Sequence, residues 1–230
     1  MEEQYEALIK RLQRLLDEKQ RSGSNRLIIA LAGPPGSGKS TVARAVAHRM
    51  SRLQKPPHVA VISADGFHLP VAALKLLPNA EEALARRGAP WTFDGAAAVN
   101  LIESLRAQSG RGDVYAPTFD HALKDPVADG LLVPREVDIC IIEGNYLLVD
   151  RPPWSRIAEI VDDRWIIQVD PILAETRVAR RHVLSGIEAT TEAAIARARN
   201  SDAINGQYVV ERSVGRYDVA IRSSDESQVL

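Results

Sequence analysis

Several kinds of residue and segment are scarce or missing in this sequence, and each absence removes a class of protein. The one cysteine, Cys140, cannot form an internal disulfide, and its place within an apolar run predicts a small buried core residue. No apolar run approaches the ~18 residues of a membrane span, and no His/Cys cluster has the spacing of a zinc site. We therefore expect a protein of a reducing compartment, without a membrane span or structural zinc.

Neither sign of charge dominates, since 29 lysines and arginines stand against 30 aspartates and glutamates. These charges are interspersed, so no basic stripe indicates a nucleic-acid partner. The first ten residues, MEEQYEALIK, are acidic from the start and lack the basic-then-apolar layout of a secretory signal. We expect a cytoplasmic protein with no nucleic-acid and no membrane partner.

The composition that remains is that of an ordinary globular protein, with 45% hydrophobic and 26% charged residues. We expect residues 1–24 to form an amphipathic helix and residues 25–230 to form a single domain. The helix carries one apolar stripe, made of Tyr5, Leu8, Ile9, Leu12, Leu15 and Leu16. Packing of this stripe on its own domain is the favoured interpretation, and the seam of a homodimer is the alternative.

The stretch on which the rest of the chain depends is GPPGSGKST, which fits the phosphate-binding pattern G-x-x-x-x-G-K-[ST]. Its residues are Gly33, Pro34, Pro35, Gly36, Ser37, Gly38, Lys39, Ser40 and Thr41. The apolar run 26–32 before it predicts a strand buried on both faces. Apolar residues at helical spacing after it predict a helix, and they are Val42, Val46, Met50 and Leu53. Strand, loop and helix together favour a nucleoside triphosphate site over a glycine-rich turn without a ligand.

The chemistry of this site follows from the expected loop geometry. Glycines let the backbone turn tightly and aim its N–H groups at an anion. The start of the helix adds further N–H groups and the positive end of its dipole. Lys39 would then reach the β- and γ-phosphates, and the Ser40 hydroxyl would bind Mg²⁺.

Four further strands are predicted, at 58–63, 137–142, 165–169 and 217–221. Asp170 predicts a cap for the helix that follows the third of these, and a helix over 191–204 is predicted to close at Asn205-Gly206. The stretch 114–121 is predicted to be short and irregular, and 124–130 to be a polar loop. Strands that alternate with helices indicate an α/β fold with a doubly wound, mostly parallel sheet.

Acidic residues follow two of these strands directly. Asp65 comes after the strand 58–63, and Glu143 comes after the strand 137–142. Ligands of such sheets bind at the carboxyl ends of the strands, so both acids are expected beside the phosphate loop. One acid would help to hold Mg²⁺, and the other would accept the proton of a substrate hydroxyl. Acids at strand ends are often only caps or turn residues, but two beside a phosphate loop favour the catalytic interpretation.

A substrate pocket is predicted from polar residues that lie among aromatic ones in irregular segments. The polar residues are His68, Asp94 and His121, and the aromatic ones are Phe67, Trp91, Phe93 and Phe119. Apolar walls with a few polar groups are typical of ligand pockets. Taken alone, each histidine is more often a structural hydrogen-bonding residue, and this alternative stays open.

Three arginines, Arg177, Arg180 and Arg181, fall on one helical face by their i, i+3 and i+4 spacing. A solvated charged face is the plain interpretation. After a strand of such a sheet, the same cluster can instead form a lid over about residues 177–200 that closes on the triphosphate. Arginine there would stabilise the charge of the transition state, and this is the interpretation that we favour.

The ordered set of segments resembles the P-loop kinases of the uridine kinase, phosphoribulokinase and bacterial pantothenate kinase group, in its uridine-kinase-like branch. The resemblance covers roughly residues 26–222 and rests on GPPGSGKST, SADGFHLP, GAPWTFD, PTFDHALKDP, IIEGNYLL and RVARRHV. It implies the P-loop NTPase fold, a three-layer α/β/α arrangement with a helical lid. It also implies ATP, Mg²⁺ and transfer of a phosphoryl group to a small molecule with a hydroxyl group.

The roles that the resemblance implies are carried over residue by residue. Catalytic roles fall to Asp65 as the base, to Lys39 and to a lid arginine, Arg180 or Arg181. The triphosphate is expected at Gly33 to Thr41 and at Arg177, and Mg²⁺ at Ser40, Glu143 and Asp65. The substrate is expected at His68, Asp94, Phe119, His121, Glu143 and Tyr146.

The acceptor itself stays open in the sequence. Uridine kinases carry a base-recognising histidine a few positions after the aromatic that Phe119 matches, where this chain has Lys124. His121 instead falls where pantothenate kinases place a histidine. A nucleoside, a sugar and a pantothenate-like molecule are the candidates.

Two other functions also fit parts of this sequence. The first is an ATP-dependent regulator without a small-molecule acceptor; a GTPase is disfavoured because the strings D-x-x-G and N-K-x-D do not occur. The second is an adenylate-kinase-like enzyme, which fits the fold but explains the DGFH segment and Asp94 less well.

Overall fold

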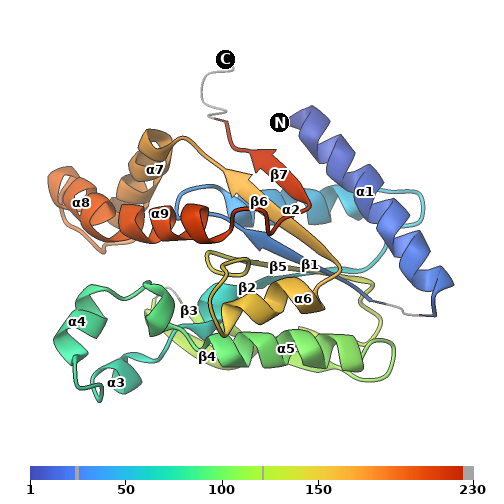
Figure 1. Cartoon of the computed structure of the whole chain (residues 1–230), viewed down its shortest axis with the longest axis horizontal. Coiled ribbons are helices and arrows are strands. Elements are labelled where there is room, and N and C mark those ends of the chain that lie inside the picture. The colour runs from blue at the N-terminus through green and yellow to red at the C-terminus, as the bar shows by residue number, and fades with distance from the viewer. Residues whose placement is uncertain (24–25, 121, 225–230) are drawn as a thin grey trace.

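A parallel sheet of five strands forms the centre of the protein (Figure 1). The computed structural model describes residues 1–23, 26–120 and 122–224. The strands are β1 Leu27–Ala32, β2 Val59–Ser63, β5 Ile139–Gly144, β6 Asp163–Gln168 and β7 Val219–Arg222. Their order is β2-β5-β1-β6-β7, and every neighbouring pair is parallel. The chain therefore winds outwards from β1 in both directions, which confirms the doubly wound α/β fold.

Both faces of the sheet are covered, because alternate residues of a strand point to opposite sides. Leu27, Ile29 and Leu31 pack with helices α1 Glu2–Arg21 and α2 Lys39–Met50. Ile28 and Ala30 pack on the other face, with α5 Gly95–Ala107 and α6 Ile157–Ile160. The buried Cys140 lies in this second core, as predicted. In the described part of the chain, no helix is long and apolar enough to cross a membrane.

The predicted N-terminal helix is present and packs on its own domain. Tyr5, Leu8, Leu12 and Leu16 are buried in the core that α1 shares with α2 and the sheet. Near its start, the Gln4 side chain meets the edge strand β7, donating to the Arg222 carbonyl at 3.1 Å and accepting from the Arg222 N–H at 2.8 Å. The apolar stripe of α1 is therefore buried in the core of its own chain.

The segments predicted to be irregular between residues 114 and 130 form a hairpin, so that prediction was wrong. Strands β3 Val114–Asp120 and β4 Asp125–Val133 pair in antiparallel fashion, with a register shift between Ala116 and Thr118. Pro117 and the exposed apolar residues of β4, among them Val127 and Leu132, obscure the alternating pattern from which a strand is recognised. His121 is outside the described residues.

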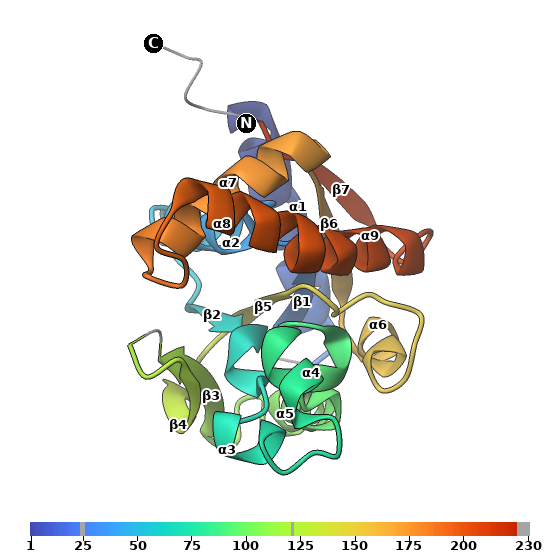
Figure 2. The ribbon, with the colours of Figure 1, turned by 90° about the vertical axis from the view of Figure 1, so that its left-hand side faces the viewer.

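The helices after β6 form a separate layer, seen opposite α3, α4 and the hairpin in Figure 2. They are α7 Pro171–Leu184, α8 Thr191–Arg197, a π-helical turn Ala198–Asp202 and α9 Ala203–Arg212. Asp170 caps α7 as predicted, since its side chain accepts from the N–H groups of Ile172 and Leu173. The predicted helix end at Asn205-Gly206 was wrong, because both residues lie buried within α9. Gly206 serves close packing, since a Cβ there would lie 3.1 Å from Cβ of Pro34.

Short elements complete the wall opposite this layer. They are α3 Val71–Leu74, α4 Ala80–Ala85 and the 3₁₀ turns Ala64–Phe67, Pro90–Thr92 and Trp154–Arg156. The first of these turns begins directly after β2 and places Asp65 at the carboxyl edge of the sheet.

Candidate functional site

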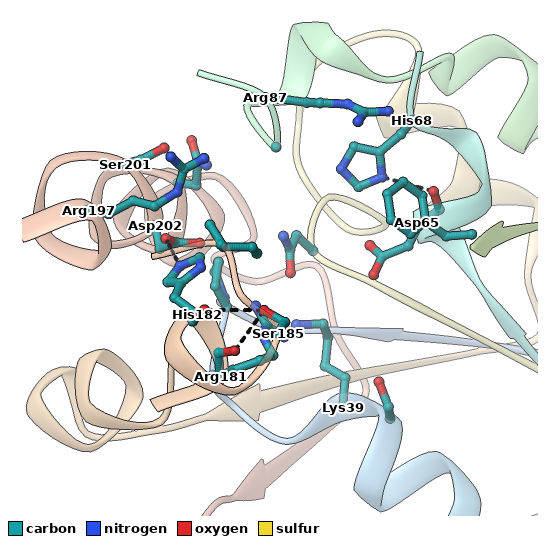
Figure 3. A pocket seen from close by; sticks show the side chains of 18 of the residues that line it. Lys39, Asp65, His68, Arg87, Arg181, His182, Ser185, Arg197, Ser201 and Asp202 are labelled. Carbon is teal, nitrogen blue, oxygen red and sulfur yellow. Dashed lines mark hydrogen bonds and ion pairs between the residues drawn. The ribbon is translucent and has the colours of Figure 1, made fainter. Parts of the chain in front are cut away.

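A cavity of about 550 Å³ opens at the carboxyl ends of β1, β2 and β5. Three walls enclose it: the loop between β1 and α2, the segments that follow β2 together with the hairpin, and the helical layer of α7 to α9. Figure 3 shows Lys39 rising from the first wall, Asp65, His68 and Arg87 on the second, and Arg181, His182 and Asp202 on the third. This position agrees with the rule that open α/β sheets bind ligands beyond their strand ends.

The phosphate loop has the backbone that its glycines predict. Gly36 and Gly38 adopt left-handed conformations, with φ of 77° and 93°, which residues with a Cβ seldom adopt. Gly36 also packs closely on α7, where an added Cβ would overlap the Ala174 carbonyl oxygen. The Ser37 hydroxyl is buried and has no hydrogen-bond partner within the described residues. A tight loop with left-handed glycines suits the anion-binding role predicted for it.

Lys39 begins α2 and projects into the cavity. Its Nζ donates to the Pro34 carbonyl at 3.0 Å, which draws the side chain back over the loop. Burial lowers the pKa of Lys39 to about 8; the charges of Glu143 and Asp65 oppose this shift, while Arg181 adds to it. The ammonium is therefore held where an anionic ligand would recover the energy lost by its burial.

Two acids meet the phosphate loop as predicted. The Ser40 hydroxyl donates to Oε1 of Glu143 at 2.9 Å, although 103 residues separate them in the chain. Glu143 is 5% exposed and pairs in register with Leu31 of β1 and Ser63 of β2. Asp65 lies two residues beyond Ser63 and also lines the cavity. Adjacent strands therefore bring the phosphate loop, Glu143 and Asp65 together.

The second wall is built around the His68 ring. Its centroid lies 3.9 Å from that of Phe93 and 5.0 Å from that of Phe119, and its Nδ1 lies 2.8 Å from the Asp65 carbonyl oxygen. Burial lowers the pKa of His68, and the Asp65 charge opposes this shift. The histidine is thus both a packed residue and a residue of the cavity lining, and its contact with a substrate stays a prediction.

Arg87 fixes this wall and was not assigned a role from sequence. Its Nη2 donates to Oδ1 of Asp125 at 2.7 Å and to the Leu69 carbonyl at 3.1 Å, and its Nη1 donates to the Lys124 carbonyl. The arginine therefore joins the segment after β2 to the hairpin. Only the basic pair Arg86-Arg87 marked it in the sequence, because its partners lie far along the chain.

The third wall carries two of the three predicted arginines, Arg177 and Arg181. It also carries a pair that sequence reasoning missed, in which Nε2 of His182 lies 2.9 Å from Oδ2 of Asp202. This pair ties α7 to the π-helical turn, a kind of turn often found at functional sites. The spacing of 20 residues between the two offered no local signal.

The structure brings together many of the residues expected at the site. The lining includes Pro35, Gly36, Gly38, Lys39, Ser40, Asp65, His68, Phe119, Glu143, Arg177 and Arg181. Of the phosphate loop, Gly33, Pro34, Ser37 and Thr41 are not part of the lining. His121 lies outside the described residues.

Three other expected residues lie away from the lining. Asp94 is exposed and caps α5, accepting from the Ala97 N–H at 2.8 Å. Tyr146 is 1% exposed in the core and donates to the Gly88 carbonyl at 2.5 Å. Arg180 is exposed on α7. Contact of these three with a ligand stays a prediction.

Comparison with known proteins shows that this chain is similar to kinases. The profile of the "Phosphoribulokinase / Uridine kinase family" matches residues 28–184. The chain is 40% identical over 210 residues to "Putative uridine kinase C227.14" of Schizosaccharomyces pombe, covering 91% of this chain and 87% of that protein. It is 41% identical over 149 residues to "ATP-dependent kinase-like protein notR'" of Aspergillus versicolor, covering 64% of this chain and 87% of that protein. A solved structure of a "putative fructose transport system kinase" from Silicibacter sp. TM1040 matches with a TM-score of 0.82 at 33% identity. The match covers 94% of this chain and 98% of that one.

Proposed function

Because the chain belongs to the phosphoribulokinase / uridine kinase family, we propose that it transfers the γ-phosphoryl group of ATP to a hydroxyl group of a small metabolite. Membership makes it a kinase-type phosphotransferase; the donor, the acceptor group and the residue roles are our proposal. One observation carries it most directly. The strand order β2-β5-β1 places Asp65, Glu143 and Lys39 around one cavity.

The phosphate chain of ATP would lie in the loop between β1 and α2. The left-handed Gly36 and Gly38 leave the loop open for backbone N–H groups to point at phosphate oxygens. Lys39 would pair with the β- and γ-phosphates, and Arg181 on α7 would add positive charge from the opposite wall. Transfer spreads charge over the phosphoryl oxygens, and these fixed cations would stabilise it.

The residues present fit Mg²⁺, which prefers oxygen ligands and keeps part of its shell for phosphates and water. The Ser40 hydroxyl and the Glu143 carboxylate lie 2.9 Å apart, and both line the cavity. When bound, Mg²⁺ would neutralise charge on the phosphate oxygens. In our proposal Ser40 and Glu143 hold it, directly or through water, and Asp65 stands beside them.

The acceptor hydroxyl would lie beside Asp65, which accepts its proton as the oxygen attacks the γ-phosphorus. Phe93, Phe119 and His68 supply a mostly apolar wall on this side of the cavity. Such a wall suits the face of a sugar ring or a base. The names of two relatives mention uridine and fructose, so both belong among the first acceptors to test.

The test is a screen of nucleosides, sugars, polyols and hydroxy acids with Mg·ATP, read by mass spectrometry. We expect one class of acceptor to gain the mass of one phosphoryl group, with ADP formed in equal amount. If ATP is hydrolysed to free phosphate with every acceptor tried, an ATP-dependent regulatory protein becomes the better assignment. If Mg·ATP does not bind at all, the proposal fails at its first step.

A further inference from the structure

The end of β7 reaches the phosphate loop, although it lies about 190 residues further along the chain. The Ser223 N–H donates to the Gln168 carbonyl at the end of β6, at 2.8 Å. This bond extends the parallel pairing of β6 and β7 by one residue beyond Arg222. The Ser223 hydroxyl then faces the loop, since a Cβ on Gly38 would lie 3.9 Å from Oγ of Ser223.

Arg177 is held between this strand end and the loop. Its Nη1 donates to Oγ of Ser223 at 2.8 Å and to the Gly36 carbonyl at 3.4 Å, and its Nη2 donates to the Ser224 carbonyl at 2.9 Å. All three acceptors are neutral oxygens. The ion pairs found among residues 1–23, 26–120 and 122–224 do not include Arg177. Among the described residues, its positive charge is therefore fixed in place at the cavity wall without a carboxylate partner.

The N-terminal helix holds the same strand end from outside. The Gln4 side chain makes two hydrogen bonds with the backbone of Arg222, the residue directly before Ser223. Gln4, Arg222 and Ser223 all lie outside the stretch 28–184 that matches the family profile. A continuous set of contacts thus runs from α1 through β7 to Arg177 and the phosphate loop.

We propose that residues 222–224 form a latch that fixes Arg177 for binding of the donor's phosphate chain, and that Gln4 positions this latch. This inference rests on the proposed function of the protein as an ATP-dependent kinase. Ser223 and Gln4 act as positioning residues, since their contacts are with Arg177 and Arg222. A guanidinium already placed by three hydrogen bonds loses little conformational freedom when phosphate binds, which raises affinity for the donor. In the part of the chain that the structure describes, Arg181 has no comparable hydrogen bond to the loop, and it remains the cation for the transferred group.

The test compares Ser223→Ala, which removes the hydroxyl acceptor, with Ser223→Thr, which keeps it. Calorimetry with Mg·ATP gives Kd without any acceptor, and steady-state rates give KM for ATP and kcat. We expect Ser223→Ala to raise Kd and KM for ATP about three- to tenfold, with kcat and the acceptor KM within twofold of wild type. Ser223→Thr should restore the wild-type Kd.

The part played by α1 is tested with Gln4→Ala and with a matched control, Gln13→Ala, which alters an exposed glutamine of the same helix. We expect Gln4→Ala to raise the Kd for Mg·ATP about two- to fivefold, and Gln13→Ala to leave it unchanged. Thermal unfolding of each variant shows whether it is folded. A wild-type Kd in Ser223→Ala would overturn the latch, as would a Kd raised equally in Ser223→Thr. Equal values in the two glutamine variants would overturn the role of Gln4.

These outcomes are distinct from failure of the proposed function. If wild type does not bind Mg·ATP, both proposals fall together. If wild type binds Mg·ATP and phosphorylates an acceptor while the serine and glutamine variants behave like wild type, the kinase stands and the latch alone is wrong.

Discussion

The Ser40 hydroxyl donates a hydrogen bond of 2.9 Å to the Glu143 carboxylate, across the boundary between α2 and β5. This contact joins the phosphate loop to the strand that lies between β1 and β2. It gathers two oxygen ligands suited to Mg²⁺ at one point of the cavity.

Replacing Glu143 with glutamine removes the negative charge but keeps the size of the side chain. We expect Glu143→Gln to lower kcat by about 100-fold or more, because the charge that holds the metal beside the phosphates is lost. The rate should also need more magnesium to reach half its maximum. Glu103→Gln, at an exposed site on α5, is the control and should behave as wild type. Full activity in Glu143→Gln at low magnesium would contradict the assignment.

Asp65 is expected to act in the chemical step rather than in donor binding. Asp65→Asn should lower kcat about 10²- to 10⁴-fold, the usual contribution of a general base. The Kd for Mg·ATP, measured by calorimetry, should stay within a few-fold of wild type. A variant that still transfers phosphate at the wild-type rate would exclude Asp65 as the base.

Affinity for ATP should fall as the pH rises through the pKa of Lys39, which burial lowers to about 8. Below this pH the ammonium is already charged, and above it Lys39 must take up a proton to pair with phosphate. We expect Kd for Mg·ATP to rise roughly tenfold between pH 7 and pH 9. Lys39→Arg should show a flat profile over this range, because its guanidinium stays charged. The same slope in both proteins would show that another group is responsible.

The loop glycine Gly36 should tolerate no side chain. Gly36→Ala combines a left-handed backbone with overlap on the Ala174 carbonyl, so we expect loss of Mg·ATP binding and a lower free energy of unfolding by more than about 2 kcal/mol. Gly215→Ala is the matched control, since Gly215 is also left-handed, with φ of 69°, but has open space around it. It should cost only about 1 kcal/mol and leave ATP binding unchanged. Urea unfolding and calorimetry measure both quantities.

Two variants of Asp94 distinguish a role in capping α5 from a role in contacting the substrate. Its side chain accepts the Ala97 N–H at the start of α5, so Asp94→Ala should lower the free energy of unfolding by about 1 kcal/mol. Asp94→Ser keeps a capping oxygen and should recover the stability. If Asp94→Ser also keeps the acceptor KM and kcat, capping is its function; a fall in activity with normal stability would support the substrate contact that the family resemblance implies.

Those parts of the site that depend on short continuous patterns or on the ends of strands could be predicted from the sequence. The phosphate loop could be predicted because glycine spacing, Lys39 and Ser40 form one continuous pattern. Asp65 and Glu143 could be placed because strand ends of a parallel sheet meet at one edge. Helix α1 could be predicted because its apolar stripe has a helical period.

The parts that were missed depend on partners far along the chain. Arg87 acts through Asp125 and the hairpin, and no local pattern records that pairing. The hairpin itself was hidden because β4 is largely exposed, so alternation of apolar and polar residues is lost. Gly206 was interpreted as a helix end, whereas its lack of a side chain lets α9 pack closely on Pro34.

The contact between Gln4 and Arg222 also covers part of the edge of the sheet. A strand at the border of a sheet exposes N–H and C=O groups that can recruit a strand from a neighbouring molecule. The N–H and C=O groups of Arg222 are already hydrogen-bonded to the side-chain amide of Gln4, as they would be to the backbone of a neighbouring strand. Intermolecular strand addition at Arg222 would first have to displace Gln4.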